Sequence, residues 1–329
     1  MNKPSFVAIG PPKTGTTWLY EMLRKHPQVE LTPVKEIGYF WEKAYLGDAG
    51  LINLINPYAR FKQSRRVVIK KEWMARRLKA HFQALAGLKL NWAELKWDFR
   101  YFVLPHNDKW YLSLFNNKKV SGDISPSYAL LPEKEIESLK NLNPDVKIII
   151  SLRDPVERQW SRVKMKIKTR SRKKKQNLIQ DNAKLIEQII EDKHNNSSFD
   201  YVEIIERWSK YFPQKNIFVF FYEELLNDPS RLLNDLCIFL GIDVVDIGKA
   251  AEERVNKGIE LDLPPKCLNL LINMNLPYLE KMPSFFSKKY PKEWLEKYKN
   301  MLANNSNVPL SNGNTINNDI SGTIEIFKS

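Results

Sequence analysis

The residues with the clearest chemistry lie near the N-terminus, in a loop that combines one lysine with several threonines. An apolar segment, residues 6–9, runs into a turn rich in glycine and proline. The turn carries Lys13 and the hydroxyls of Thr14, Thr16 and Thr17, and a helical pattern begins directly after it. The free N–H groups at a helix N-terminus and the helix dipole both attract anions. This order of strand, loop and helix start therefore predicts a phosphate-binding site.

The position of the lysine distinguishes this loop from the Walker A loop of nucleotide triphosphatases. In a Walker A loop the lysine directly follows the second glycine, but here Thr16 follows Gly15 and the lysine precedes that glycine. The displaced lysine and the Thr-Thr-Trp ending resemble the 5′-phosphosulfate loop of the sulfotransferase family, whose members use 3′-phosphoadenosine 5′-phosphosulfate (PAPS). The cofactor contacts that the resemblance implies are Pro12, Lys13, Thr14, Gly15, Thr16, Thr17 and Trp18. The alternative is a turn that only connects a strand to a helix.

A second segment extends the resemblance. Residues 146–152 form a continuous apolar run, which indicates a parallel strand buried on both faces. Asp154 suits a helix N-cap and Pro155 the first helical turn. Arg153 then stands at the strand end, and Ser161 lies about two turns along the helix. In the sulfotransferase family the Arg and Ser of a similar segment hold the 3′-phosphate of PAPS, and a guanidinium suits a phosphate. The alternative for Arg153 is an ordinary ion pair with Asp154.

Sulfuryl transfer needs a group that neutralises the leaving phosphate and a base that takes the acceptor proton. Lys13 suits the bridging oxygen of the leaving phosphate. Glu36 is the predicted base, because carbohydrate-type sulfotransferases carry a similar Lys-Glu segment whose Glu has this role. The same resemblance predicts that Tyr222, at the end of a late apolar strand, lies near the adenine. The alternative for Glu36 is a surface carboxylate paired with Lys35.

One position departs from the pattern of carbohydrate sulfotransferases. These enzymes often have a lysine just before the Ser-Pro of a later segment, where this chain has Ile124 before Ser125. Lys35 is the residue that we expect to replace that lysine. The resemblance therefore implies the donor PAPS more directly than it implies the acceptor. We expect the acceptor to be a hydroxyl or amine of a small molecule or a carbohydrate.

The composition fits one enzyme domain of the α/β class. A chain of 329 residues with 43% hydrophobic content is long enough to bury a sizeable core. We predict a single domain over residues 1–302, with a central parallel sheet flanked by helices and a P-loop-like phosphate loop. Residues 43–115 are predicted as a helical insertion whose aromatics favour a local core, with a sugar-accepting cleft as the alternative. The polar residues 303–329 predict a frayed tail.

The net charge of +14 predicts anionic partners. Much of the excess lies in residues 162–175, which are rich in Lys and Arg. One interpretation is a basic rim that receives an acidic acceptor such as an anionic polysaccharide, and the alternative is a mobile, solvated loop. Nucleic acid is not a predicted partner, because aromatic residues are not interleaved with these charges.

Cysteine content and hydropathy guide the predictions of metal content and location. Cys237 and Cys267 show no metal-ligand spacing, and we expect no metal. No apolar run reaches membrane-spanning length, so a cytoplasmic protein without a membrane span is predicted. The sequence does not indicate the oligomeric state.

Two other functions stay open at this point. A nucleotide kinase would need the Walker lysine and a magnesium-binding Asp at a strand end, whereas Asp154 follows an arginine here. A non-catalytic polyanion-binding module would use residues 162–175 and would not consume PAPS. A requirement for magnesium distinguishes the kinase from the sulfotransferase, and consumption of PAPS distinguishes the sulfotransferase from the binding module.

Overall fold

The computed structural model describes residues 3–45, 77, 79, 83, 91–116, 119–174, 183–192, 199–245 and 259–306. At its centre is a 4-stranded parallel sheet with the order β2-β1-β3-β4. Its strands are β1 (Phe6–Ala8), β2 (Gly122–Ile124), β3 (Lys147–Leu152) and β4 (Ile217–Phe221). Because β1 and β3 are neighbours in the middle, the segments that follow them lie side by side at the carboxyl edge of the sheet.

The sheet is buried on both faces, and successive residues of each strand belong to opposite cores. Val7 packs in one hydrophobic cluster with Ile148, while Ala8 packs in a second cluster with Ile149. Side chains of a strand point alternately to its two faces, so a strand covered on both sides is apolar at most of its positions. The continuous apolar runs of the sequence were therefore correctly interpreted as buried parallel strands.

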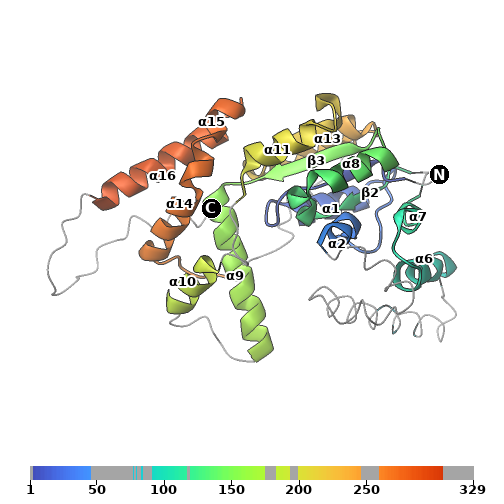
Figure 1. Cartoon of the computed structure of the whole chain (residues 1–329), viewed down its shortest axis with the longest axis horizontal. Helices are drawn as coiled ribbons and strands as arrows, with labels where there is room; N and C mark the ends of the chain where they lie inside the picture. The colour runs from blue at the N-terminus through green and yellow to red at the C-terminus, as the bar shows by residue number, and fades with distance from the viewer. Residues whose placement is uncertain are drawn as a thin grey trace.

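Helices cover both faces of this sheet (Figure 1). The smaller cluster includes side chains from α1 (Thr16–Lys25), α12 (Tyr222–Asn227) and α13 (Pro229–Leu240). The larger cluster draws on α2 (Tyr39–Tyr45), α6 (Trp92–Val103), α7 (Asp108–Ser113), α8 (Glu133–Leu142), α9 (Pro155–Lys174), α10 (Ala183–Glu191), α11 (Tyr201–Ser209), α14 (Pro265–Leu279), α15 (Met282–Phe285) and α16 (Tyr290–Ser306). Short 3₁₀ turns lie at Pro126–Leu130 and Gln214–Asn216. The predicted α/β class is confirmed.

Helix α9 follows β3 directly, and in Figure 1 the arrow of β3 points toward α9, α14 and α16. Asp154 caps α9, because its Oδ1 accepts hydrogen bonds from the N–H of Val156 at 2.9 Å and of Glu157 at 3.3 Å. The helix continues to Lys174. The mobile-loop interpretation is therefore wrong for residues 162–174, which are helical, and Lys175 lies outside the described residues.

The predicted insertion at 43–115 is described in part. The aromatic side chains of α6 and α7 form a local core in which Trp97, Tyr101, Trp110 and Tyr111 are buried. The rings of Trp97 and Tyr101 stack with centroids 5.0 Å apart. Residues 46–76 and most of residues 77–90 lie outside the described residues. Of the predicted frayed tail 303–329, residues 303–306 are instead helical, as the end of α16, and residues 307–329 lie outside the described residues.

Candidate active site

The phosphate loop predicted from the sequence joins β1 to the N-terminus of α1. Gly15 precedes the helix with a φ of 95°, a conformation that side chains other than glycine rarely adopt. A Cβ at Gly15 would also lie 3.1 Å from Leu225 and 3.2 Å from the ring of Tyr222. A glycine cannot cap the helix with a side chain, so the first N–H groups of α1 are available to an anion.

Thr14 ties the loop to β3. Its buried hydroxyl donates to the carbonyl oxygen of Pro11 at 2.7 Å and accepts from Ser151 Oγ at 2.6 Å. Gly10 makes this approach possible, because a Cβ there would lie 2.1 Å from Ser151 Oγ. Trp18 is likewise buried, in the core beneath α1. The side chains of Thr14 and Trp18 therefore stabilise the loop from within the protein. We expect their backbone groups, not their side chains, to make any contacts with a cofactor.

At this loop, cationic side chains from two other segments of the chain affect the pKa of Lys13. Burial lowers the pKa of Lys13, and the positive charges of Arg153, Lys164 and Lys168 lower it further. Lys164 and Lys168 belong to α9, so this helix directs part of its basic face at the loop. Cations that destabilise one another in this way are stabilised when an anion enters between them. The electrostatics of the loop thus favour a ligand with more than one negative charge.

Lys35 also belongs to this cationic group. Its Nζ donates to Thr17 Oγ1 at 2.8 Å and to Thr16 Oγ1 at 3.4 Å. Burial lowers the pKa of Lys35, the carboxylate of Glu36 raises it, and Lys13 lowers it. Ile124, which occupies the position where the sequence resemblance led us to expect a lysine, is buried in the core. The ammonium group of Lys35, which we expect to replace the missing lysine, lies at the first turn of α1.

Arg153 and Tyr222 meet beside the loop. The guanidinium carbon of Arg153 lies 4.5 Å from the centroid of the Tyr222 ring. Its NH2 donates to Glu157 Oε2 at 3.2 Å, so its ion pair is with Glu157 and not with Asp154. In the part of the chain that the structure describes, Arg153 Nε is buried without a hydrogen-bond partner. An oriented guanidinium with an unused donor is suited to a phosphate.

Ser161 lies on α9 at a spacing that puts it on the same helix face as Lys164 and Lys168. All three side chains are partly buried. Because Lys164 and Lys168 influence the charge of Lys13, this face of α9 is directed toward the phosphate loop. Helical spacing therefore places Ser161 on the face of α9 that carries Lys164 and Lys168.

Glu36 is exposed, although Lys35 before it is partly buried and Ile37 after it is buried. Its side chain is 46% exposed, and its Oε1 lies 4.0 Å from Lys35 Nζ. Lys13, with φ 80°, and Glu36, with φ 66°, are the two non-glycine residues with positive φ in the described part of the chain. Such conformations cost energy and are concentrated at functional sites. Lys13 and Glu36 are also the two residues that the sequence predicts to be catalytic, and that role stays a prediction.

A buried network at the end of β2 holds the segment after Glu36. The N–H of Gly38 donates to Ser125 Oγ at 3.1 Å, and Ser125 donates to Asp123 Oδ1 at 2.6 Å. Tyr111 OH donates to the other carboxylate oxygen of Asp123 at 3.3 Å. Burial raises the pKa of Asp123 to about 6, although these hydrogen bonds oppose the shift. Sequence reasoning missed this network, because its members are distant in the chain.

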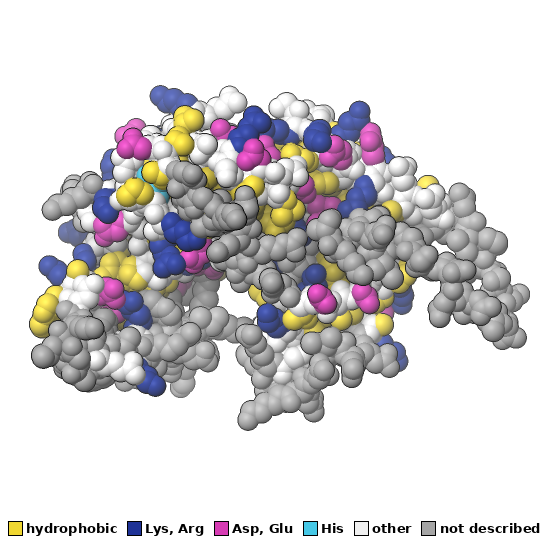
Figure 2. All heavy atoms as spheres, turned by 180° about the vertical axis from the view of Figure 1, so that it is seen from behind, with side chains coloured by type: hydrophobic (Ala, Val, Ile, Leu, Met, Phe, Trp, Pro, Cys, Tyr) yellow, Lys and Arg dark blue, Asp and Glu magenta, His cyan; other side chains and the backbone are white. Residues whose placement is uncertain are grey.

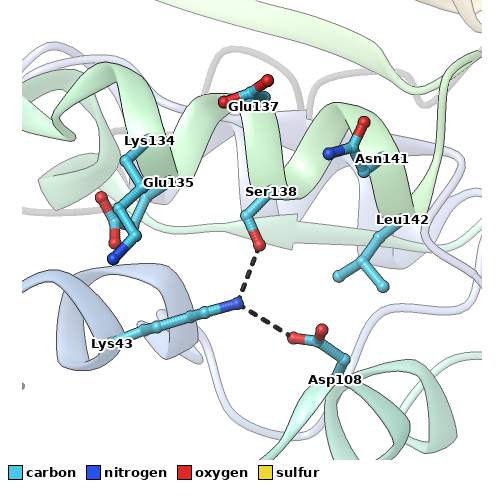
Figure 3. A pocket seen from close by; sticks show the side chains of 8 residues that line it. All are labelled: Lys43, Asp108, Lys134, Glu135, Glu137, Ser138, Asn141 and Leu142. Carbon is cyan, nitrogen blue, oxygen red and sulfur yellow. Dashed lines mark hydrogen bonds and ion pairs between the residues drawn. The ribbon is translucent and has the colours of Figure 1, made fainter. Parts of the chain in front are cut away.

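A separate polar hollow of about 330 Å³ lies between α2, α7 and α8 (Figure 3). Lys43 Nζ points into it and binds Ser138 Oγ at 2.8 Å and Asp108 Oδ1 at 3.3 Å. The remaining lining residues are Lys134, Glu135, Glu137, Asn141 and Leu142. None of the site residues predicted from the sequence lines this hollow. The phosphate loop, which holds the predicted site residues, is therefore the candidate site.

Sulfotransferases are among the known proteins that the chain resembles. Residues 4–246 match the model of the sulfotransferase family. The chain is 23% identical over 290 residues to the membrane-associated sulfotransferase kil1 of Dictyostelium discoideum, covering 75% of this chain and 58% of that protein. It is 30% identical over 166 residues to carbohydrate sulfotransferase 15 of Mus musculus, covering 48% and 26%. A sulfotransferase structure from Alicyclobacillus acidocaldarius aligns with a TM-score of 0.49 and 18% identity, over 90% of this chain and 96% of that one.

These relatives correct the predicted location. The prediction of a cytoplasmic protein is overturned by the first of them, which is a membrane-associated sulfotransferase. The prediction depended on the lack of a long apolar run, and that lack does not specify a compartment. Among the described residues, no helix combines the length and the apolar character needed to cross a membrane.

Proposed function

The chain belongs to the sulfotransferase family, and on this basis we propose that it transfers a sulfuryl group from PAPS to a hydroxyl or amine of an acceptor. The observation that carries the proposal is the group of cations around the free N-terminus of α1. Lys13, Lys35 and Arg153 come from three segments of the chain; the charge of Arg153 lowers the pKa of Lys13, and the charge of Lys13 lowers the pKa of Lys35. PAPS carries anionic groups at both its 5′ and 3′ ends, which is the charge pattern that this group would stabilise.

The 5′-phosphosulfate is assigned to the phosphate loop. Its oxygens would accept hydrogen bonds from the first N–H groups of α1 and from the hydroxyls of Thr16 and Thr17, with backbone support from Pro12, Thr14, Gly15 and Trp18. The 3′-phosphate is assigned to Arg153 and Ser161. The unpartnered Nε of Arg153 supports this assignment, since a buried donor gains from an acceptor. Tyr222, which stacks on Arg153, is assigned to the adenosine.

In the proposed reaction the acceptor oxygen or nitrogen attacks sulfur in line, and the bond between sulfur and the bridging oxygen breaks. Lys13 stabilises the negative charge that develops on that oxygen. Glu36 takes the proton that the acceptor loses, and its exposed side chain is open to an arriving acceptor. The products are the sulfated acceptor and adenosine 3′,5′-bisphosphate. Lys35, hydrogen-bonded to Thr17, adds a second positive charge at the transferring group.

We propose a carbohydrate acceptor, and an anionic one. The matched relative carbohydrate sulfotransferase 15 supports the class of acceptor. The basic face of α9 supports an anionic acceptor, because it continues beyond Ser161 through Lys164 and Lys168. On the face of the molecule drawn in Figure 2, Lys and Arg side chains are interspersed with Asp and Glu. We therefore place the approach of the acceptor along α9.

Radiolabelled PAPS tests this function directly. The purified protein is incubated with [³⁵S]PAPS and a panel of neutral and anionic oligosaccharides, in the presence of EDTA. We expect label in an anionic oligosaccharide without added magnesium. In a parallel reaction with ATP and no EDTA, transfer of phosphate that requires added magnesium would instead show a kinase. Binding of the polyanions with no consumption of PAPS would show a binding module.

A further inference from the structure

Two acidic residues, Asp154 and Glu157, follow Arg153 at the start of α9. Asp154 is buried and caps α9, and Glu157 accepts a hydrogen bond from Arg153. Burial raises the pKa of Asp154, and the charge of Glu157 raises it further. Two carboxylates this close repel each other when both are ionised, and they need a cation besides Arg153. Without one, the acidic pair would weaken the attraction of Arg153 for a phosphate.

Helix α16 supplies that cation and a hydrogen-bond donor. Lys297 Nζ lies 3.5 Å from Asp154 Oδ2 and 3.3 Å from Glu157 Oε1. Tyr298 OH, buried beside it, donates to Asp154 Oδ2 at 2.5 Å. These contacts join residues 140 and 144 positions apart in the sequence. Charge-assisted hydrogen bonds of this kind fix the orientation of both partners.

The two oxygens of Glu157 are divided between two cations. Oε1 binds Lys297 and Oε2 binds Arg153, so Lys297 limits the positions that Glu157 can take. Glu157 and the ring of Tyr222 in turn hold the guanidinium of Arg153 in place while its Nε stays unpartnered. With Lys297 present, the positive charges of Arg153 and Lys297 balance the negative charges of the two carboxylates. Without it, one uncompensated negative charge would face the position assigned to the 3′-phosphate.

The turn of α16 before Lys297 also contacts the end of β4, the strand next to β3. Trp294 Nε1 donates to Glu223 Oε1 at 3.1 Å, and its ring contacts Phe221 with centroids 5.6 Å apart. Glu223 directly follows Tyr222, which stacks on Arg153. In Figure 1, α16 lies beyond the end of the sheet at which the arrow of β3 points. Residues 294–298 therefore contact the carboxyl ends of both β3 and β4.

We propose that α16 is a positioning element of the nucleotide site, in which Lys297 and Tyr298 set Arg153 for the 3′-phosphate through Asp154 and Glu157. This inference rests on the proposed function, since it presumes that Arg153 binds the 3′-phosphate. It adds to the site a helix that lies outside the family match, which ends at residue 246. Lys297 and Tyr298 act through other residues and do not themselves touch the nucleotide.

The test compares two nucleotides on the full-length protein. Dissociation constants for adenosine 3′,5′-bisphosphate and for AMP, which lacks the 3′-phosphate, are measured by calorimetry. In Lys297→Met we expect the preference for the bisphosphate to fall by about tenfold, as for a weakened charge-assisted contact, while the affinity for AMP changes little. Lys297→Arg should restore the preference. Tyr298→Phe keeps the ring and should reduce the preference less.

Lys299→Met is the matched control, because Lys299 lies on the same helix and pairs with Glu280 on the surface at 3.1 Å. It should leave both affinities unchanged. Thermal unfolding of each variant shows whether it is folded. The inference is overturned if folded Lys297→Met and Tyr298→Phe keep the wild-type preference, or if they lose affinity for both nucleotides equally. A wild-type protein that binds AMP as tightly as the bisphosphate would refute the role of Arg153 itself, and this inference with it.

Discussion

Replacing Glu223 with Gln measures the cost of a carboxyl group buried behind the nucleotide site. Burial is the main cause that raises the pKa of Glu223, to about 7, and the charges of Asp154 and Glu157 add to the shift. One carboxylate oxygen accepts from Trp294, and the other is buried without a partner in the described structure. A glutamine keeps the acceptor for Trp294 and cannot ionise. The substitution therefore removes the titration and preserves the packing.

The sign of the effect follows from proton binding. An unfolded chain loses this proton near the ordinary glutamate pKa of 4.5, and the folded protein loses it at a pKa of about 7. Between these values the folded protein binds more protons, so the free energy of unfolding falls as the pH rises. The full shift corresponds to at most about 3 kcal/mol above the folded pKa. Partial exposure of the residue reduces this, and we expect about 1 to 3 kcal/mol.

Urea denaturation at several pH values between about 5 and 8 measures this contribution. The free energy of unfolding of Glu223→Gln, relative to wild type, should rise by about 1 to 3 kcal/mol from the lowest to the highest pH. Asp123, whose pKa is raised to about 6, titrates in both proteins and cancels in the difference. Parallel curves for the two proteins would refute the reasoning, because they would mean that Glu223 is ionised at little cost in the folded state.

Three further predictions concern the reaction. Arg153→Ala should weaken binding of adenosine 3′,5′-bisphosphate by about 2 kcal/mol and affect AMP far less in calorimetry, and equal losses would contradict its assignment. Glu36→Gln should lower turnover by about 10²- to 10⁴-fold while PAPS still binds, and near-normal turnover would exclude Glu36 as the base. Changing the basic residues 172–175 to Ser should raise KM for an anionic acceptor and flatten its dependence on salt, with PAPS affinity unchanged. A wild-type salt dependence would mean that these residues do not guide the acceptor.

Local patterns explain why the sequence predicted the strands and the phosphate loop. The apolar run at 146–152 and the cap at Asp154 depend on neighbouring residues only, and the structure has both. The loop before α1 could be recognised from its residue types. Glycine allows the positive φ of the turn, lysine supplies a positive charge, and the threonines supply hydroxyl groups. The predicted roles of its residues in catalysis stay predictions.

Contacts between distant residues could not be predicted in the same way. Thr14 and Ser151 are 137 positions apart, and no pattern near either residue indicates that their hydroxyls meet. The basic run could be interpreted as a loop or a helix, since its charges repel in both cases. The turn of α16 around Lys297 carries no motif, and its importance appears only when the packing brings it to Asp154 and Glu157.

Sulfuryl transfer by wild type and by Lys13→Ala tests the central claim most directly. Both proteins are incubated with [³⁵S]PAPS and the acceptor found in the screen, and Lys25→Ala, at the opposite end of α1, is the control. The account predicts transfer by wild type and the control, and a loss of about 10²- to 10³-fold in Lys13→Ala, as for one lost transition-state donor. Unchanged turnover in Lys13→Ala would contradict it.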